Sequence, residues 1–106
     1  MIETLRGTIC RLVRDELTRA RVAHGDMFHS DHEAIAVTWE EVEEAREFLE
    51  KAEDVVTILW RYHVRHDIEP AHFQLERLEK FAVDGAAELI QVAAMARKWK
   101  EGLEND

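Results

Sequence analysis

Four glutamates within five residues, Glu40-Glu41-Val42-Glu43-Glu44, are the side chains of this sequence best suited to chemistry. They fall in a predicted helix whose apolar stripe consists of Ile35, Thr38, Val42, Ala45 and Leu49. At 100° per residue, Glu41 and Glu44 lie beside that stripe and not opposite it. Two carboxylates three residues apart on a half-buried face repel each other unless a cation or a proton lies between them. Glu41 and Glu44 are therefore candidate metal ligands.

A solvated helix face is the alternative explanation for these charges, because runs of glutamate on helices usually face water. The acids that fit this explanation lie mostly on the far side of the helix: Glu40, Glu43, Glu47 and Glu50.

A second group of polar residues stands in an otherwise small and apolar segment near the end of the chain, FAVDGAAELIQVAAMA. Its polar members, which share one helix face, are Asp84, Glu88 and Gln91. A helix that is apolar nearly all round is buried nearly all round, so Glu88 should meet a partner inside the protein. A divalent cation shared with Glu41 and Glu44 would satisfy it. Asp84 could extend that site, but an ion pair with Lys80 or an arginine is the simpler expectation for it.

The chemistry of the candidate ligands indicates which cation they would bind. Oxygen ligands from Glu41, Glu44, Glu88 and Gln91, with no Cys or His at ligand spacing, favour Mg²⁺, with Mn²⁺ as its substitute. Mg²⁺ held by carboxylates and water commonly takes phosphate oxygens as its remaining ligands. A nucleotide is therefore the expected substrate.

Three helices are expected to position these residues. The first spans 2–22, and its apolar face consists of Ile2, Leu5, Ile9, Leu12 and Val13. The second starts at Ser30, where Ser30 and Glu33 form a capping box, and runs to about Asp67, with a possible kink near Glu53-Asp54. The third spans about 71–101, and its inward side chains are Phe73, Leu75, Leu78, Phe81 and Ala82. Three residues are predicted to mark helix boundaries. Gly25 ends the first helix, Pro70 is a first helical residue and Gly102 ends the third helix.

The composition predicts one all-α domain over 1–106, a bundle of three to four helices. The chain has 106 residues, a net charge of −9, and a single cysteine, Cys10, expected to be a buried small hydrophobe. The acidic balance argues against a nucleic-acid partner, and no apolar run is long enough for a membrane span. No signal peptide is evident, so a soluble, cytoplasmic protein is expected. Such long apolar helices have more apolar surface than one subunit covers, so the bundle should be completed by oligomerisation.

Two blocks of the chain resemble a known family. The segment FHSDHEAIAVTWEEVEE, residues 28–44, is similar to the opening of small bacterial and phage MazG-like, all-α nucleoside triphosphate pyrophosphohydrolases, including their EExxE motif. ELIQVAAM, residues 88–95, resembles the E-x-x-Q-VAAM helix of the same branch. The resemblance covers about a quarter of the chain and implies a helical homodimer or homotetramer. It also implies Mg²⁺-dependent cleavage of a (d)NTP to (d)NMP and pyrophosphate.

The resemblance assigns roles to individual residues. It makes Glu41, Glu44 and Glu88 metal ligands and Glu40 a ligand or a neighbour that orients water, so that Glu40 or Glu41 would serve catalysis. Gln91 stands where the broader family has Asp, and an amide binds Mg²⁺ more weakly and cannot act as a base. A catalytically silent relative that binds a nucleotide or a protein is therefore the alternative function. The region around 53–72 is longer than is usual in the family.

Candidate substrate-binding residues flank the two blocks. Arg97 and Lys98 follow the second block and could stabilise the pyrophosphate, although basic residues at a helix C-terminus also suit the macrodipole. His32 belongs to the first block and either contacts substrate or supports the helix start. The paired histidines His29/His32 and His63/His66 lack the Glu-x-x-His pattern of a di-iron site. Core or interface positions are expected for the tryptophans, with base stacking by one of them or by Phe28 as the alternative; the sequence specifies neither base nor sugar.

Overall fold

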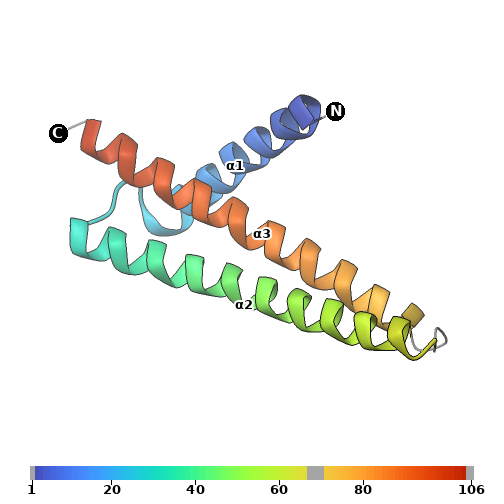
Figure 1. Cartoon of the computed structure of the whole chain (residues 1–106). Coiled ribbons are helices and arrows are strands. Elements are labelled where there is room, and N and C mark those ends of the chain that lie inside the picture. The colour runs from blue at the N-terminus through green and yellow to red at the C-terminus, as the bar shows by residue number, and fades with distance from the viewer. Residues whose placement is uncertain (1, 67–70, 105–106) are drawn as a thin grey trace. The chain divides into compact units, whose positions relative to one another are not determined.

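The structure, a computed structural model, describes residues 2–66 and 71–104. Within these ranges it contains three α-helices and no strand: α1 (Ile2–His24), α2 (Asp31–Val64) and α3 (Ala71–Glu104) (Figure 1). The all-α prediction is confirmed. The predicted role of Pro70 lies outside the described residues. Within those same ranges, no helix is both long enough and apolar enough to cross a membrane.

Two compact units divide the chain, and each contains part of α2 and part of α3. The first unit combines Met1–Val42 with Glu88–Asp106, so it holds α1, the start of α2 and the end of α3. The second unit is Glu43–Ala87, a pair of segments from the rest of α2 and α3. The expectation of a single domain over 1–106 stays a prediction.

The connection between α1 and α2 follows the chemistry of its residues. Gly25 adopts a positive φ of 95°, and its N–H bonds the Arg21 carbonyl at 2.9 Å, which ends α1 as predicted. Ser30 then caps α2: its Oγ accepts the N–H of Glu33 at 3.1 Å and its carbonyl accepts that of Ala34 at 3.0 Å. The Ser30 half of the predicted capping box is therefore present.

One predicted helix boundary is wrong. α3 continues through Gly102 to Glu104, so Gly102 does not stop the helix. A glycine inside a helix costs only about 1 kcal/mol relative to alanine, which the rest of the helix can offset. α2 runs as one helix through Glu53-Asp54, and the possible kink there stays a prediction.

The buried face of α2 differs from the predicted one. Its buried residues are small: Ala45, which belongs to the predicted stripe, and also Ala34 and Val55. The larger stripe members Ile35, Val42 and Leu49 are 53%, 38% and 60% exposed. Small side chains face inward because they let a neighbouring helix approach closely, and the larger ones are left outside. The side of α2 that faces inward therefore lies closer to Glu41 and Glu44 than predicted, and both residues are half-buried.

Each unit is packed around few large side chains. In the first unit Leu17, Ala34 and Ala94 are buried. In the second unit Val55 is fully buried, and a Cβ added to Gly85 would lie 3.2 Å from the Cβ of Phe48. That distance is too short for an ordinary contact between two Cβ atoms, so only glycine fits there without a shift of one helix.

Several other side chains expected to be buried are exposed in the single chain. On α1 they are Ile2, Leu5, Ile9 and Leu12, while Val13 is half-buried. On α3 they are Phe73, Leu75 and Ala82, while Leu78 and Phe81 are half-buried. Cys10 is likewise exposed and not the buried hydrophobe predicted. These positions have helical spacing, but spacing alone does not say which face the fold covers.

A matched pair of neighbouring valines tests the burial. Val55 is 0% exposed and Val56 is 52% exposed. Val55→Ala should lower the free energy of unfolding by roughly 2 kcal/mol, through lost transfer energy and a residual cavity. Val56→Ala should change it by less than about 0.5 kcal/mol at a protein concentration low enough to keep the chain monomeric. Urea unfolding followed by circular dichroism measures both, and equal costs would contradict the burial described here.

Candidate functional site

Two carboxylates meet in the first unit. Glu41 of α2 and Glu88 of α3 each offer an oxygen, and these atoms lie within 4.8 Å of each other. Oε2 of each residue is buried, and Oε2 of Glu88 has no hydrogen-bond partner within the part of the chain that the structure describes. A buried charge is stabilised only by an opposite charge or by hydrogen bonds, so the buried oxygen of Glu88 calls for a partner.

Helical spacing explains how the two acids come together. Glu41 lies seven residues, or two turns, after Ala34 and therefore on the same face of α2. Ala34 and Ala94 are both 0% exposed, and such short side chains allow the helices of the first unit to pack closely. The long side chains of Glu41 and Glu88 then reach each other in this close packing.

The other two glutamates of the first motif differ in their surroundings. Glu44 belongs to the second unit, but it follows Glu41 by three residues in the same helix and is half-buried. Residues three apart on a helix have Cβ atoms about 5–6 Å apart, so Glu44 is the neighbour of Glu41 along α2. Glu40 is exposed. Glu40 therefore lies on a different side of α2 from Glu41 and Glu44, which are half-buried.

A cavity of about 410 Å³ adjoins Glu41 within the first unit. Its walls include Arg19, His24, Val37, Glu41, Gln91 and Met95. Glu41 and Gln91 are thus both predicted metal ligands and wall residues. The volume falls in the range of small-molecule sites, about 300–1,000 Å³, and the walls are both apolar and polar.

The contribution of α1 to this cavity was missed by sequence reasoning. Glu16, Arg19 and His24 line it, and Glu16 forms an ion pair with Arg19. Nothing in the spacing of α1 distinguishes these residues from other charged residues of an amphipathic helix. Their role depends on where α1 packs in the first unit, which a local pattern does not reveal.

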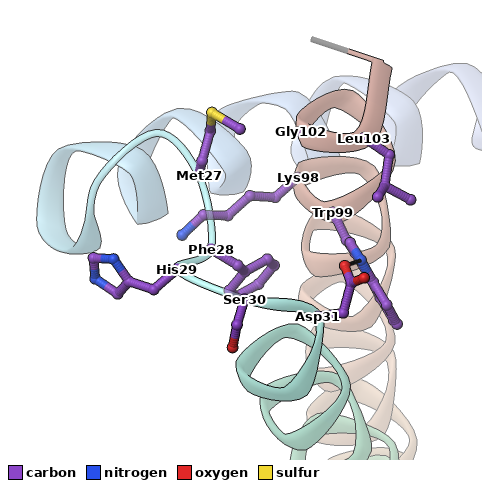
Figure 2. Close-up of a pocket in the computed structure, with 9 residues that line it drawn as sticks. All are labelled: Met27, Phe28, His29, Ser30, Asp31, Lys98, Trp99, Gly102 and Leu103. Carbon is purple, nitrogen blue, oxygen red and sulfur yellow. Dashed lines mark hydrogen bonds between the residues drawn. The ribbon is translucent and has the colours of Figure 1, made fainter. Parts of the chain in front are cut away.

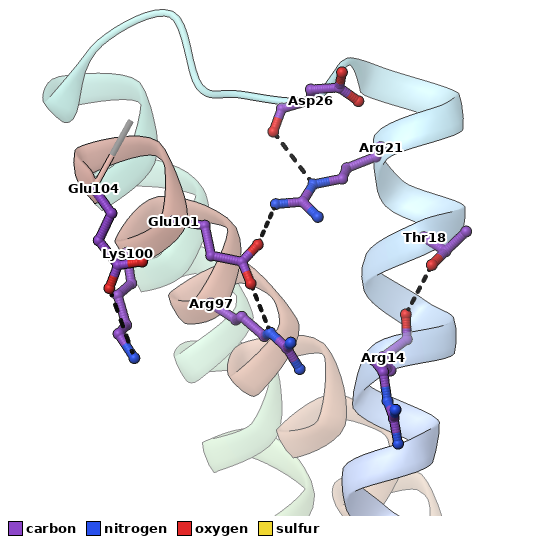
Figure 3. A network of polar contacts seen from close by, with 8 residues as sticks. All are labelled: Arg14, Thr18, Arg21, Asp26, Arg97, Lys100, Glu101 and Glu104. Atoms are coloured by element: carbon purple, nitrogen blue, oxygen red, sulfur yellow. Dashed lines mark hydrogen bonds and ion pairs between the residues drawn. The ribbon is translucent and has the colours of Figure 1, made fainter. Parts of the chain in front are cut away.

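A polar network holds α1 against α3 (Figure 3). The carboxylate of Glu101 accepts hydrogen bonds from Arg21 of α1 at 2.6 Å and from Arg97 of α3 at 2.9 Å. Arg21 also donates through Nε to the carbonyl of Asp26 at 3.4 Å. The Arg21 guanidinium, together with that of Arg97, holds the pKa of the Glu101 carboxyl below its ordinary value of 4.5. The network links the helix that supplies cavity walls to the helix that supplies Glu88.

The predicted substrate-binding residues do not line the Glu41 cavity. Arg97 pairs with Glu101, His32 is exposed, and Lys98 lines a different cavity. In the second unit, the ammonium of Lys80 lies 2.9 Å from the carboxylate of Asp84, so the ion pair expected for Asp84 is confirmed.

Comparisons of this chain with protein-family models, with curated proteins and with solved structures found no match.

The lowered pKa of Glu101 predicts how stability depends on pH. The interaction with Arg21 and Arg97 stabilises the folded chain above the unfolded-state pKa of this carboxyl, and the stabilisation is lost as the pH falls through the lower folded-state pKa. Glu101→Gln should therefore be less stable than the wild type at pH 7. The difference should shrink below about pH 4.

Chemical unfolding across a pH series measures this effect. Glu104→Gln is the matched control, because Glu104 lies 3.9 Å from Lys100 and its side chain is 60% exposed. The control should follow the wild type at every pH. A difference for Glu101→Gln that stays constant down to the lowest pH would refute the ionic role.

Proposed function

We propose that the chain is a Mg²⁺-dependent nucleoside triphosphate pyrophosphohydrolase that converts a (d)NTP to a (d)NMP and pyrophosphate. The main support is the buried Oε2 of Glu88, which lies close to a carboxylate oxygen of Glu41. Glu41 also lines a cavity of a size that suits a nucleoside. The similarity of residues 28–44 and 88–95 to the MazG-like family favours the same function.

The donor set fits a hard divalent cation. Glu41 and Glu88 supply carboxylate oxygens, and Glu44 is the next acid along the same face of α2. Gln91 lines the same cavity as Glu41 and offers an amide oxygen there. We therefore propose Mg²⁺ as the cofactor, with Mn²⁺ as a substitute. The bound ion would polarise a phosphoryl oxygen and lower the pKa of a bound water.

The residues that line the cavity offer further roles in the proposed reaction. Glu41 faces the cavity whereas Glu40 is exposed, so Glu41 is the better candidate to orient the attacking water. Val37 and Met95 offer an apolar surface for the base, and His24 and Arg19 offer polar groups at the same cavity. Arg97 and Lys98 line no part of this cavity, so any contact they make to the pyrophosphate would require substrate to extend beyond it.

Activity measurements test the proposal. Wild-type protein with Mg²⁺ should release pyrophosphate from at least one member of a panel of NTPs and dNTPs. Glu41→Gln and Glu88→Gln should each lower the rate roughly a hundredfold or more, because each removes a charged metal ligand. Glu47→Gln, on an exposed position of α2, should leave the rate unchanged.

Metal binding supplies a second measurement that does not require turnover. Millimolar Mg²⁺ should raise the melting temperature of the wild type, because a ligand of the folded state stabilises it, and should not raise that of Glu88→Gln. Equal shifts for both proteins, together with no pyrophosphate from any nucleotide, would reject the enzyme.

Gln91 favours the alternative, a catalytically silent protein that binds nucleotide or a protein partner. The amide lines the cavity but is a weaker Mg²⁺ ligand than a carboxylate. Gln91→Asp separates the two functions, because a silent chain with an otherwise complete site would gain turnover. Nucleotide binding without turnover in the wild type, and with turnover in Gln91→Asp, would support the silent protein.

We also propose that the chain self-associates as a homodimer or homotetramer. The exposed apolar side chains of α2 include Ile35, Val42, Leu49 and Val56, which recur every seven residues. Such a repeat forms an apolar seam along a helix, and a large exposed seam commonly marks an interface.

Sedimentation velocity at micromolar concentration tests the association. The wild type should sediment as a dimer or larger species, and Val56→Glu should shift it toward monomer because a charge would be buried in the seam. Thr57→Glu, at the next exposed position of the same helix, is the matched control and should not shift it. A wild type that is monomeric at these concentrations would contradict the proposal.

A further inference from the structure

A second cavity, of about 230 Å³, lies within the first unit between the start of α2 and the end of α3. Figure 2 shows Lys98 reaching from α3 toward the loop that carries Met27, Phe28 and His29. None of the residues that line this cavity lines the Glu41 cavity. The two cavities are therefore separate features of the same unit.

Lys98 is the unusual residue of this cavity. It is only 3% exposed, and its ammonium forms no hydrogen bond or ion pair with any residue in the described ranges. Its Nζ lies 4.4 Å from the centroid of the Phe28 ring, and a cation over an aromatic face offsets part of the desolvation cost. A buried lysine that pairs with no described carboxylate is notable in a chain with 23 acidic and 14 basic residues.

The start of α2 adds further positive character to the same cavity. Ser30 already bonds the N–H of Glu33 through Oγ and that of Ala34 through its carbonyl. The N–H groups of Asp31 and His32 are the ones that the helix itself leaves without an acceptor. A helix N-terminus of this kind attracts anions, since the macrodipole and the N–H donors act together.

One group in the cavity opposes an anion. Asp31 lines it, and its Oδ1 accepts a hydrogen bond from the indole Nε1 of Trp99 at 3.0 Å (Figure 2). This bond holds the carboxylate against Trp99 but does not neutralise it. The charge of Asp31 should therefore weaken anion binding, which gives a substitution with the opposite expected effect to the removal of Lys98.

We propose that this cavity binds the phosphate group of a small molecule, with the Lys98 ammonium as its counter-ion and the start of α2 as its hydrogen-bond donor. The site needs no metal, because its charge comes from the protein. It is independent of the proposed hydrolase activity, since Glu41, Glu88 and Gln91 are not among its lining residues.

The test is a titration of the full chain with inorganic pyrophosphate in EDTA, which removes any contribution of metal. In ¹⁵N–¹H NMR spectra, the amides of Asp31 and His32 and the indole of Trp99 should shift together and saturate. Lys98→Met keeps the length and apolar stem of the side chain, and it should weaken binding at least about tenfold, as expected for the loss of a charge-assisted bond. Lys100→Met, at an exposed position two residues on, should bind like the wild type.

Asp31→Asn is the second variant. It removes the negative charge, and its amide oxygen can still accept the hydrogen bond from Trp99. It should bind pyrophosphate roughly two- to fivefold more tightly than the wild type. A structural role of Lys98 alone would not produce opposite shifts in the two variants. Absence of saturable shifts in the wild type, or equal affinity in Lys98→Met, would overturn the proposal, whether or not the chain hydrolyses nucleotides.

Discussion

Close packing between helices is the constraint on which the structure depends. In the first unit it requires Ala34 and Ala94, which are fully buried, and in the second it requires Gly85, whose missing Cβ leaves room for Phe48. With so little volume between the backbones, few large apolar side chains fit inside. The consequence is a small core for each unit and large apolar side chains on the outside of the single chain.

The same closeness governs the electrostatics of the first unit. It brings the carboxylates of Glu41 and Glu88 together and removes an oxygen of each from water, although the chain is already strongly acidic. It also buries Lys98 beside Phe28, in the cavity that Asp31 lines as well. Glu41 and Glu88 thus lie apart from Lys98, since neither acid is among the residues that line the Lys98 cavity.

The sequence predicted the helices well and their faces poorly. Capping by Ser30, termination at Gly25 and the extents of the helices follow from local chemistry, which a few neighbouring residues decide. The stripe of Ile35, Val42 and Leu49 was assigned to the interior because periodicity gives the spacing of a face but not which neighbour covers it. Glu41 and Glu88 could be paired from the sequence because buried acids need partners, whereas the walls supplied by α1 depend on tertiary packing alone.

The exposure of Cys10 has a practical consequence. The chain has one thiol, and it lies on the surface of α1 in place of the interior. A maleimide or nitroxide reagent would therefore modify a single known position in the unaltered protein. Distances from that label to a second probe at the start of α2 would report whether α1, whose residues line the larger cavity, moves when a ligand is added.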